Sequence, residues 1–260
     1  MAARQPSGPP PPPTVCRIRL RYAKRGRLRF TSHRDVARVF ERAVRRTALP
    51  IAHSAGFSPH PKISWVGAAP TGVASEAEYV EIGLTAPRSA ADLAAQLDAV
   101  LPDGLDVLDA VVAHTGSLAD RMEASRWELR LPGCDPTQAR DALAAFLASD
   151  QVLVSRRTKG GMRDVDTRAA VLTASGATAP DDSCVILQLV VRHTTPVVRP
   201  DDVLAGLRAV APLDLGAPLV ATRLAQGPFR PGEADAEPGI DDPLAPDRAA
   251  GGSVDTSLSA

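Results

Sequence analysis

Alternation of apolar and polar residues predicts a first strand at Cys16–Tyr22. Cys16, Ile18, Leu20 and Tyr22 fall on one side of this segment, and arginines occupy the positions between them. Strict alternation of this kind is typical of a strand that buries one of its faces. We therefore expect the first strand to place three arginines opposite the core.

A helix is predicted after this strand. Ser32 is a favourable N-cap, and Asp35 stands three residues later as a capping-box partner. The helix should end near Ala48, because Pro50 disfavours its continuation. Its apolar stripe comprises Val36, Val39, Phe40, Ala43, Val44 and Thr47, and its opposite side carries Arg34, Arg38, Arg42 and Arg45.

The remaining pattern repeats the order strand, helix, two strands, helix, strand. In the first half we expect strands at Lys62–Val66, Glu78–Leu84 and Leu105–Ala113, with a helix from Ser89 to about Val100. In the second half we expect strands at Arg126–Leu131, Gln151–Ser155, Cys184–Arg192 and Pro218–Arg223, an extra strand near Met162–Val171, and helices at Pro136–Ala148 and after Pro200.

Two tandem βαββαβ units predict an α+β protein made of two ferredoxin-like domains. The first unit should span residues 15–115 and the second residues 120–229. Helices cover one sheet face in this fold, so Arg17, Arg19 and Arg21 should lie on the open face. Residues 1–14 contain five consecutive prolines and are expected to be disordered.

Residues 230–260 are expected to form a disordered acidic tail. Between Pro231 and Ala260 there are seven acidic residues and a single basic one, Arg248. Such a segment keeps a protein soluble. A second interpretation is that it competes with nucleic acid for a basic face elsewhere in the chain.

Basic residues are concentrated in the first unit. Thirteen residues from Cys16 to Lys62 are Lys or Arg and only Asp35 and Glu41 are acidic, although the net charge of the chain is zero. A block this dense attracts a polyanion, and nucleic acid is the usual one. The alternative is cross-strand pairing, in which Glu81 neutralises one of the arginines.

An unusual loop, Gly56–Lys62, follows the first helix. Its two prolines restrict the backbone, and Gly56 permits a positive φ. A stiff loop can display Phe57 for base stacking and His60 and Lys62 for polar contacts. A second basic loop, Arg156–Arg163, is either another phosphate contact or an ordinary hairpin turn.

Histidines in the basic block suggest a second kind of chemistry. His33 stands near the start of the first helix, and His53 and His60 lie in the following loop. His33 and His60 are therefore candidates for general acid and base in metal-free RNA cleavage. They can equally hydrogen-bond backbone groups in a tight loop.

The cysteines argue against a metal or iron–sulfur centre in this chain. Cys16, Cys134 and Cys184 are far apart, and no C-x-x-C pair occurs. We expect no cofactor and no metal. Three separate cysteines fit a reducing compartment, and no apolar stretch approaches membrane-spanning length. The expected location is the cytoplasm, with no membrane partner.

The chain resembles a radical-SAM-associated family of unknown function. The residues that carry the resemblance are Gly26–Asp35, Glu41–Arg46, Leu49–Pro50 and Gly56–Lys62, followed by Gly72, Ser75 and Glu78–Tyr79, and more loosely by Arg163–Asp166 and Val198–Pro200. The similarity extends from about Ile18 to Phe229. This DUF-type domain stands alone or is fused C-terminally to B12-binding radical SAM proteins.

The resemblance implies a radical SAM partner that carries SAM, an iron–sulfur cluster and, in B12-binding members, cobalamin. Two positions depart from the family pattern. The family usually has Leu in place of Arg34 and often has an aromatic residue in place of His53, which argues against a catalytic role for His53. No activity is established for the family, so whether this chain is an enzyme stays open.

The resulting hypothesis is an accessory protein that binds structured RNA, such as tRNA or rRNA, for a radical SAM enzyme. The predicted nucleic-acid-binding residues are Arg17, Arg19, Arg21, Arg25, Arg27, Arg38, Arg45, Phe57, His60 and Lys62, with His33 helping to shape the pocket. The first alternative is a metal-independent endonuclease similar in fold to RAMP-type CRISPR enzymes. The second is a protein-interaction module that docks an acidic partner.

Overall fold

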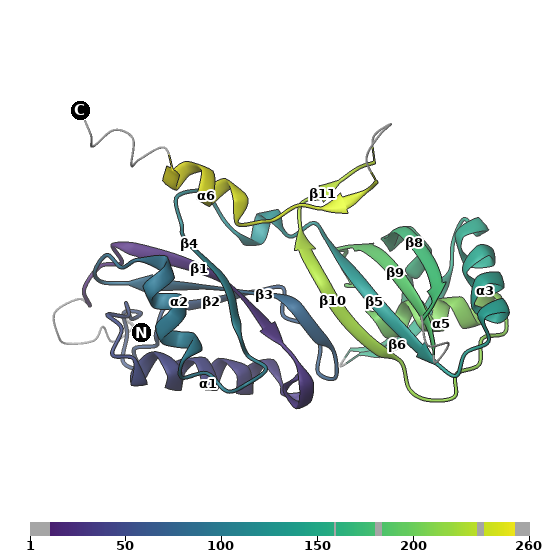
Figure 1. The fold of residues 1–260 in the computed structure, drawn as a ribbon, viewed down its shortest axis with the longest axis horizontal. Coiled ribbons are helices and arrows are strands. Elements are labelled where there is room, and N and C mark those ends of the chain that lie inside the picture. The colour runs from purple at the N-terminus through teal and green to yellow at the C-terminus, as the bar shows by residue number, and fades with distance from the viewer. Residues whose placement is uncertain (1–10, 159, 180–183, 233–236, 253–260) are drawn as a thin grey trace, which may run out of the picture. The chain divides into compact units, whose positions relative to one another are not determined.

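Figure 1 shows the computed structural model of the chain, which describes residues 11–158, 160–179, 184–232 and 237–252. The chain divides into two units. Unit 1 consists of Met1–Ala119 together with Leu244–Ala260, and unit 2 consists of Asp120–Pro243. Both units combine α-helices with antiparallel β-sheet, as the sequence pattern predicts.

Unit 1 contains a four-stranded sheet with two helices on one face. Its elements are β1 (Cys16–Lys24), η1 (Gly26–Phe30), α1 (His33–Arg46), β2 (Ile63–Val66), β3 (Ala74–Leu84), α2 (Ala90–Asp98), β4 (Val107–Val112) and α6 (Ala245–Gly252). β1 lies between β4 and β3, and β2 pairs with β3. All three of these pairings are antiparallel.

The core of unit 1 lies between its sheet and the helices α1 and α2. β1 contributes Ile18, Leu20 and Tyr22, which are nearly inaccessible to solvent. Phe40 of α1 packs its ring 4.8 Å from Tyr22 and 5.0 Å from Trp65 of β2, centroid to centroid. The apolar positions that predicted the strand and the helix therefore meet in one aromatic cluster.

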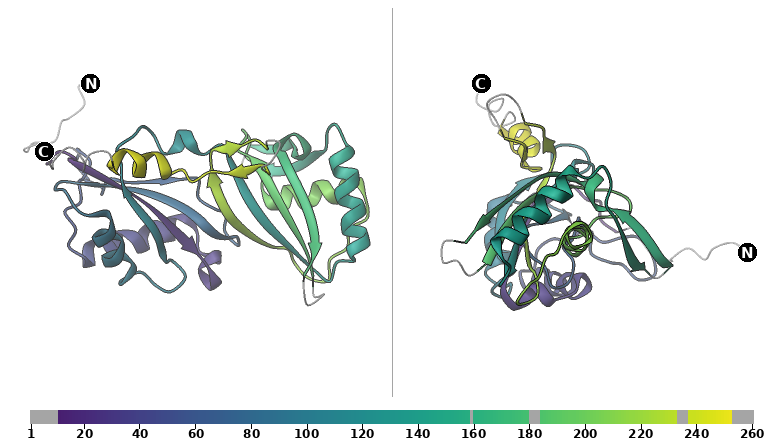
Figure 2. Two further views of the ribbon diagram at one scale, coloured as in Figure 1. Left: turned by 45° about the horizontal axis from the view of Figure 1, so that its top comes forward. Right: turned by 90° about the vertical axis from the view of Figure 1, so that its right-hand side faces the viewer.

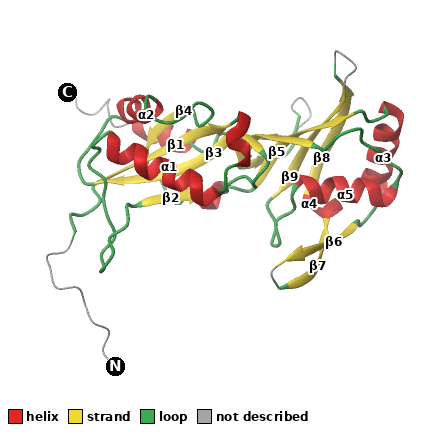
Figure 3. Ribbon diagram, turned by 90° about the horizontal axis from the view of Figure 1, so that it is seen from below, coloured by secondary structure: helices red, strands yellow, loops and turns green. Residues whose placement is uncertain are grey.

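Both helices begin where capping residues predict. Ser32 accepts a hydrogen bond from the Asp35 N–H at the start of α1, and Ser89 accepts one from the Asp92 N–H at the start of α2. Each side chain satisfies a backbone donor that the first helical turn leaves without a partner. Figure 3 shows α1 lying across the strands of unit 1.

The acidic C-terminal segment contains ordered structure, which corrects the prediction of a disordered tail from residue 230. Residues Ala245–Gly252 form the helix α6, which contacts β4 and belongs to unit 1 (Figure 2). The reason is specific: Leu244 and Asp247 are buried, so this segment does not behave as a solvated charged chain. The end of the predicted tail, residues 253–260, lies outside the described part, and so do residues 1–10.

Unit 2 repeats the strand order of unit 1 with additions. Its elements are β5 (Ala124–Pro132), α3 (Pro136–Ala148), β6 (Leu153–Thr158), β7 (Gly161–Asp166), α4 (Thr167–Ala170), β8 (Val171–Thr178), β9 (Cys184–Arg192), α5 (Pro200–Val210), β10 (Val220–Gly227), β11 (Phe229–Arg230) and β12 (Gly239–Ile240), and η2 (Ala119–Arg121) precedes it. The order is β10-β5-β9-β8, all antiparallel.

The second strand of this sheet is not the predicted one. Residues 151–155 were expected in the sheet, but among the described strands β6 pairs with β7 alone, in a separate hairpin. β8 takes the place beside β9 instead. The segment Val171–Thr178 is rich in small and polar residues, and only Val171 is buried, so it lacks the alternation that identifies a half-buried strand.

Core packing around Phe40 gives a stability prediction. Phe40→Ala should lower the free energy of unfolding of unit 1 by about 3–5 kcal/mol, because a buried aromatic side chain is replaced by a cavity. The chain has two tryptophans, Trp65 in unit 1 and Trp127 in unit 2. Urea unfolding followed by Trp65 fluorescence in a Trp127→Phe background therefore reports on unit 1. The control Val39→Ala, at a half-buried position, should cost far less.

Candidate nucleic-acid interface

β1 divides its residues between two faces of the unit 1 sheet. Ile18, Leu20 and Tyr22 enter the helix-covered core. Since successive side chains of a strand point to opposite faces, Arg17, Arg19 and Arg21 point away from α1. We call this second side the outer face. It was expected to be open and to bind phosphate through all three arginines.

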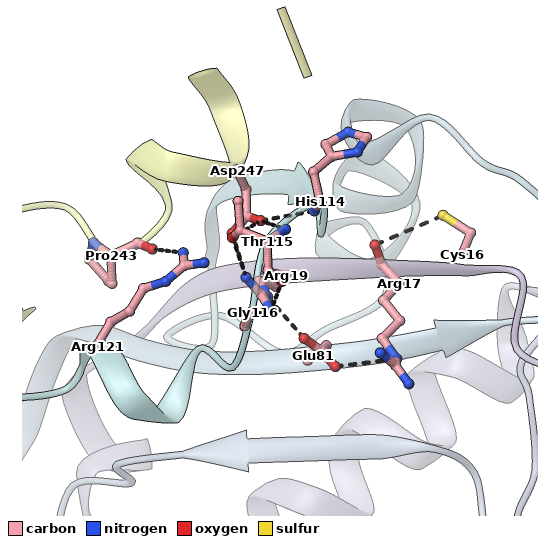
Figure 4. Close-up of polar contacts among 10 residues, drawn as sticks. All are labelled: Cys16, Arg17, Arg19, Glu81, His114, Thr115, Gly116, Arg121, Pro243 and Asp247. Atoms are coloured by element: carbon pink, nitrogen blue, oxygen red, sulfur yellow. Dashed lines mark hydrogen bonds and ion pairs between the residues drawn. The ribbon is translucent and has the colours of Figure 1, made fainter. Parts of the chain in front are cut away.

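Arg19 is buried on the outer face, so the structure does not present it to solvent as the sequence pattern predicts. Its side chain is 3% exposed. Nε donates to Glu81 Oε2 at 2.9 Å, and Nη1 donates to Asp247 Oδ2 at 2.5 Å (Figure 4). Nη2 donates to the Gly116 carbonyl oxygen at 2.5 Å. α6 and the segment after β4 cover this arginine, and the carboxylates of Glu81 and Asp247 neutralise it.

The flanking arginines of β1 differ from Arg19 and from each other. Arg17 is 61% exposed and forms a long ion pair with Glu81, with 3.6 Å between Nε and Oε1. Arg21 is half-buried, and its Nε is buried with no hydrogen-bond partner among the described residues. Of the three predicted contacts on this strand, Arg17 alone presents most of its side chain to solvent.

The two predicted arginines of the following turn are exposed but are not equivalent. Arg25 pairs with both oxygens of Glu76 and donates to Asp106 Oδ2 at 2.7 Å. The hydrogen bond to Glu76 is the main reason that the pKa of Arg25 is raised above its usual value. Arg27, in η1, has no ion pair among the described residues. Arg27 is therefore the more available cation.

Helix α1 presents a row of arginines to solvent. Arg34, Arg38, Arg42 and Arg45 are all exposed, and we call them the arginine stripe. At 100° per residue they fall within a sector of about 80° and extend over about 16 Å of the helix. Val36, Phe40, Ala43 and Val44 are buried on the other side, so packing fixes which way the stripe faces.

Acidic neighbours neutralise the arginine stripe only weakly. Arg38 lies 3.5 Å from Asp35 Oδ1, and Arg45 lies 3.5 Å from Glu41 Oε2, in exposed pairs. Exposed pairs of this kind contribute little and exchange readily with other anions. Arg34 and Arg42 have no ion pair in the described part of the chain. Both lay on the polar side of the helical pattern, which is the signal that could have added them to the predicted site.

The loop after α1 forms a narrow arm. The Ser54 N–H donates to the His60 carbonyl at 2.8 Å, and the His60 N–H donates to Ser54 Oγ at 3.0 Å. The Lys62 N–H donates to the Ala52 carbonyl at 2.7 Å. These bonds close the base of the arm and leave its tip in solvent, where Phe57 is 70% exposed.

Lys62 and Arg17 line the same hollow at the base of this arm. The hollow has a volume of about 190 Å³, and its other polar lining residues are Ser64 and Glu81. Lys62 Nζ donates to Thr14 Oγ1 at 3.0 Å. Two cations and a hydroxyl around one small hollow favour an anion, although Glu81 offsets part of their charge.

The three histidines of the basic block, His33, His53 and His60, contact different groups. The His33 ring lies 5.4 Å from Trp65 in an edge-to-face contact, and His60 is exposed at the base of the arm. The Nδ1 atom of His53 lies 3.1 Å from the Ile51 carbonyl oxygen. No contact recorded for the described residues joins His33 to His60, so the geometry assembles no acid–base pair from them.

The second predicted basic segment forms the β6–β7 hairpin of unit 2, seen as a separate ribbon in Figure 3. Arg156 is bound to Asp202 and to the Val197 carbonyl, so it supports the fold of this unit. Arg157 and Arg163 are exposed. Lys159 lies outside the described residues. The hairpin can add at most a secondary cationic surface.

A serine–histidine pair in unit 2 was not anticipated from the sequence. Ser125 Oγ lies 2.7 Å from His193 Nε2, and His193 Nδ1 lies 2.8 Å from the Met122 carbonyl oxygen. Nδ1 must donate to the carbonyl, so Nε2 accepts from the serine hydroxyl. The resemblance to a hydrolase pair ends there, because Ser125 is 1% exposed and a substrate cannot reach it.

Burial lowers the pKa of His193 below its ordinary value. The folded state then binds fewer protons than the unfolded state, so unit 2 should lose stability as the pH falls below about 6.5. We expect a slope of up to about 1.4 kcal/mol per pH unit, which His193→Gln should abolish. Trp127 fluorescence during urea unfolding in a Trp65→Phe background measures it.

His60→Gln is the control for this pH dependence, because it removes an exposed imidazole from unit 1. It should leave the slope measured for unit 2 unchanged. A slope that persists in the His193→Gln protein would show that another group in unit 2 is responsible.

Several other site classes lack support in the described residues. No group of three or more His, Cys, Asp and Glu side chains there is arranged to hold a metal ion. Cys16, Cys134 and Cys184 form no disulfide, and burial raises the pKa of the Cys134 thiol. Among the helices described, none is long and apolar enough to cross a membrane.

Comparison with known proteins places most of the chain in one family. Residues 17–200 match the model of a family described as an uncharacterized protein conserved in bacteria (DUF2344). No curated protein matches the chain. The matched segment includes β1, η1, the arginine stripe and the arm.

Proposed function

The chain belongs to this uncharacterized bacterial family, DUF2344, and we propose that it is an RNA-binding accessory protein of a radical SAM enzyme. In this proposal unit 1 holds structured RNA, such as tRNA or rRNA, while the partner modifies it. The single observation that carries the proposal is the arginine stripe on α1. The following paragraphs give the supporting contacts.

The arginine stripe has the properties of a phosphate-binding surface. Its residues are exposed and follow one helix face, and two of the four have no acidic partner among the described residues. Contacts between arginine and phosphate are charge-assisted and suit the planar guanidinium. Arg27, in η1, is a further exposed cation that precedes α1 in the chain. Nucleic acid is favoured over a small anion because the cations form a row.

The arm adds an aromatic side chain, Phe57, to the cationic surface. The Phe57 ring is 70% exposed, so a base can stack on it without any rearrangement of the arm. The same arm carries the exposed residues His60 and Lys62. Single-stranded nucleic acids bind surfaces that combine cations with aromatic rings on which bases stack. This combination favours an unpaired region of RNA at the arm.

The fold fits this role. In each unit the strand order places the first strand between the fourth and the third, with the second at the far side of the third. We infer from this order that both units are ferredoxin-like and arose by duplication, with β6–β7 and α4 inserted in unit 2. Folds of this type host many functions, so the site and not the fold carries the argument.

A radical SAM partner remains part of the proposal. The partner would carry SAM, the iron–sulfur cluster and, in B12-binding members, cobalamin. The cysteines of this chain occur singly, whereas a cluster needs several closely placed thiolates. The endonuclease alternative gains no support from the contacts of His33 and His60. Docking to an acidic protein partner is the alternative that the following experiment separates.

Replacing three stripe residues should weaken RNA binding in a salt-dependent way. For Arg34→Ala/Arg38→Ala/Arg42→Ala, the slope of log affinity against log salt should fall in magnitude by about 2 to 3, since each phosphate contact contributes about 0.7 to 0.9. Alanine favours helix, so α1 should persist. Retention of total small RNA on filters across a salt series measures both quantities.

The matched control is Arg88→Ala/Arg126→Ala/Arg140→Ala, which removes the same charge from exposed positions outside the stripe. It should leave most of the affinity and the slope intact. Equal losses in the two triple variants would contradict a defined site on α1. If the unmodified protein retains no RNA at low salt, docking to an acidic protein becomes the leading function.

Stacking on the arm predicts a different signature. Phe57→Ala should weaken RNA binding by about 1–3 kcal/mol per stacked base while leaving the salt slope unchanged. Phe30→Ala is the control, because Phe30 is another exposed phenylalanine of unit 1, positioned under the Arg29 guanidinium. The same filter assay applies. If Phe57→Ala changes the salt slope and leaves the affinity at low salt unaltered, Phe57 does not stack on a base.

A further inference from the structure

One carboxylate of α6 occupies a cluster of hydrogen-bond donors on the outer face. Asp247 Oδ1 accepts from the N–H groups of His114 and Thr115, each at 2.9 Å, and from Thr115 Oγ1 at 2.6 Å. Asp247 Oδ2 accepts from Arg19 Nη1 at 2.5 Å (Figure 4). Four donors on one carboxylate group form a complete anion-binding site.

All four donors belong to the N-terminal part of unit 1. Arg19 comes from β1, and His114 and Thr115 follow β4 directly. The carboxylate arrives from a distant part of the chain, since Arg19 and Asp247 are 228 residues apart in sequence. The donors of this site therefore come from β1 and from the stretch after β4, whereas the acceptor comes from α6.

The contact that holds α6 in place combines apolar burial with polar bonds. Leu244 and Asp247 are its buried anchors, and Arg248 adds an exposed ion pair of 2.6 Å with Asp109. Ala245, Pro246 and Ala249 are exposed. A helix of eight residues that ends in two glycines does not persist alone in water. Docking on unit 1 is what keeps this segment helical.

We propose that the outer face of unit 1 is a second anion-binding site, which α6 occupies with Asp247 until the phosphates of an RNA strand displace it. The choice of RNA rests on the proposed function. The existence of the site rests on the Asp247 contacts alone. This site lies on the sheet face opposite the arginine stripe, so the two can be tested separately.

A phosphate group suits the donors that Asp247 now uses. Backbone N–H groups and a guanidinium are the usual ligands of phosphate oxygens. With α6 removed, Arg17, Arg19 and Arg21 would form a row at alternate strand positions, about 7 Å apart, with Glu81 still paired to Arg17 and Arg19. A tethered carboxylate has a high effective concentration, so a single small anion competes poorly with it. A polyanion that contacts several arginines at once can displace it.

Asp247→Asn in the full chain tests the proposal. The substitution keeps the shape of the side chain and removes its charge, so α6 should leave the outer face more easily. The affinity for a fluorescein-labelled 20-nucleotide poly(U) should rise by about tenfold, within the usual range of coupling between two sites. Asp241→Asn, which makes the same charge change at an exposed residue, should alter the affinity far less.

Two further variants show which residues are responsible for the increase in poly(U) affinity. Adding Arg19→Ala to Asp247→Asn should abolish it, because the central donor of the site is lost. Adding the triple stripe substitution should leave the relative gain intact. If the stripe binds RNA and Asp247→Asn brings no gain over Asp241→Asn, this inference is overturned and the proposed function stands. If Asp247→Asn raises the affinity and the stripe substitutions do not affect RNA binding, the inference stands and the stripe is not the RNA-binding site of the proposed function.

Hydrogen exchange of the unmodified chain keeps the test valid if Asp247→Asn fails to fold. Saturating poly(U) should accelerate exchange of the α6 amides and should keep the His114 and Thr115 amides protected. Unchanged or slower exchange in α6 at saturating poly(U) would overturn the inference.

Discussion

The buried guanidinium of Arg19 determines how unit 1 is assembled. A charge that is 3% exposed is stable only when opposite charge and hydrogen-bond acceptors surround it. Glu81 of β3, the backbone after β4 and Asp247 of α6 supply these groups. One side chain thereby connects β1 to three other segments. Removing either acidic partner would leave Arg19 paired with the other, so the two carboxylates share the task of compensating this buried charge.

Two groups of arginines can be distinguished in unit 1, those that form ion pairs between segments and those that are exposed without an acidic partner among the described residues. Arg19 and Arg25 hold segments together, because each pairs with two carboxylates. Arg34 and Arg42 project from α1 without such partners in the described residues. The two groups are equally basic in composition and differ only in their tertiary surroundings. A count of basic residues therefore overstates the surface that is available to a polyanion.

Local physics made much of the fold predictable. Alternation located β1, and the capping serines located α1 and α2 within one or two residues. Long-range pairing was not predictable in the same way. No local signal joins Arg19 to a carboxylate 228 residues away, and the small residues of β8 carry little periodicity. The exposed tip of the arm followed from its prolines and glycine, whereas the burial of Arg19 depended on a segment that composition marked as a tail.

The discontinuity of unit 1 also affects how the protein is made. The chain leaves unit 1 after Ala119 and returns at Leu244. A ribosome adds about 5–20 residues per second, so roughly 6–25 seconds separate the synthesis of these two points. During that interval β1 has no α6 beside it, and Arg19 lacks Asp247. The newly made unit would then display on its outer face the cations that the finished protein conceals, and its last helix would complete it only after unit 2 has emerged.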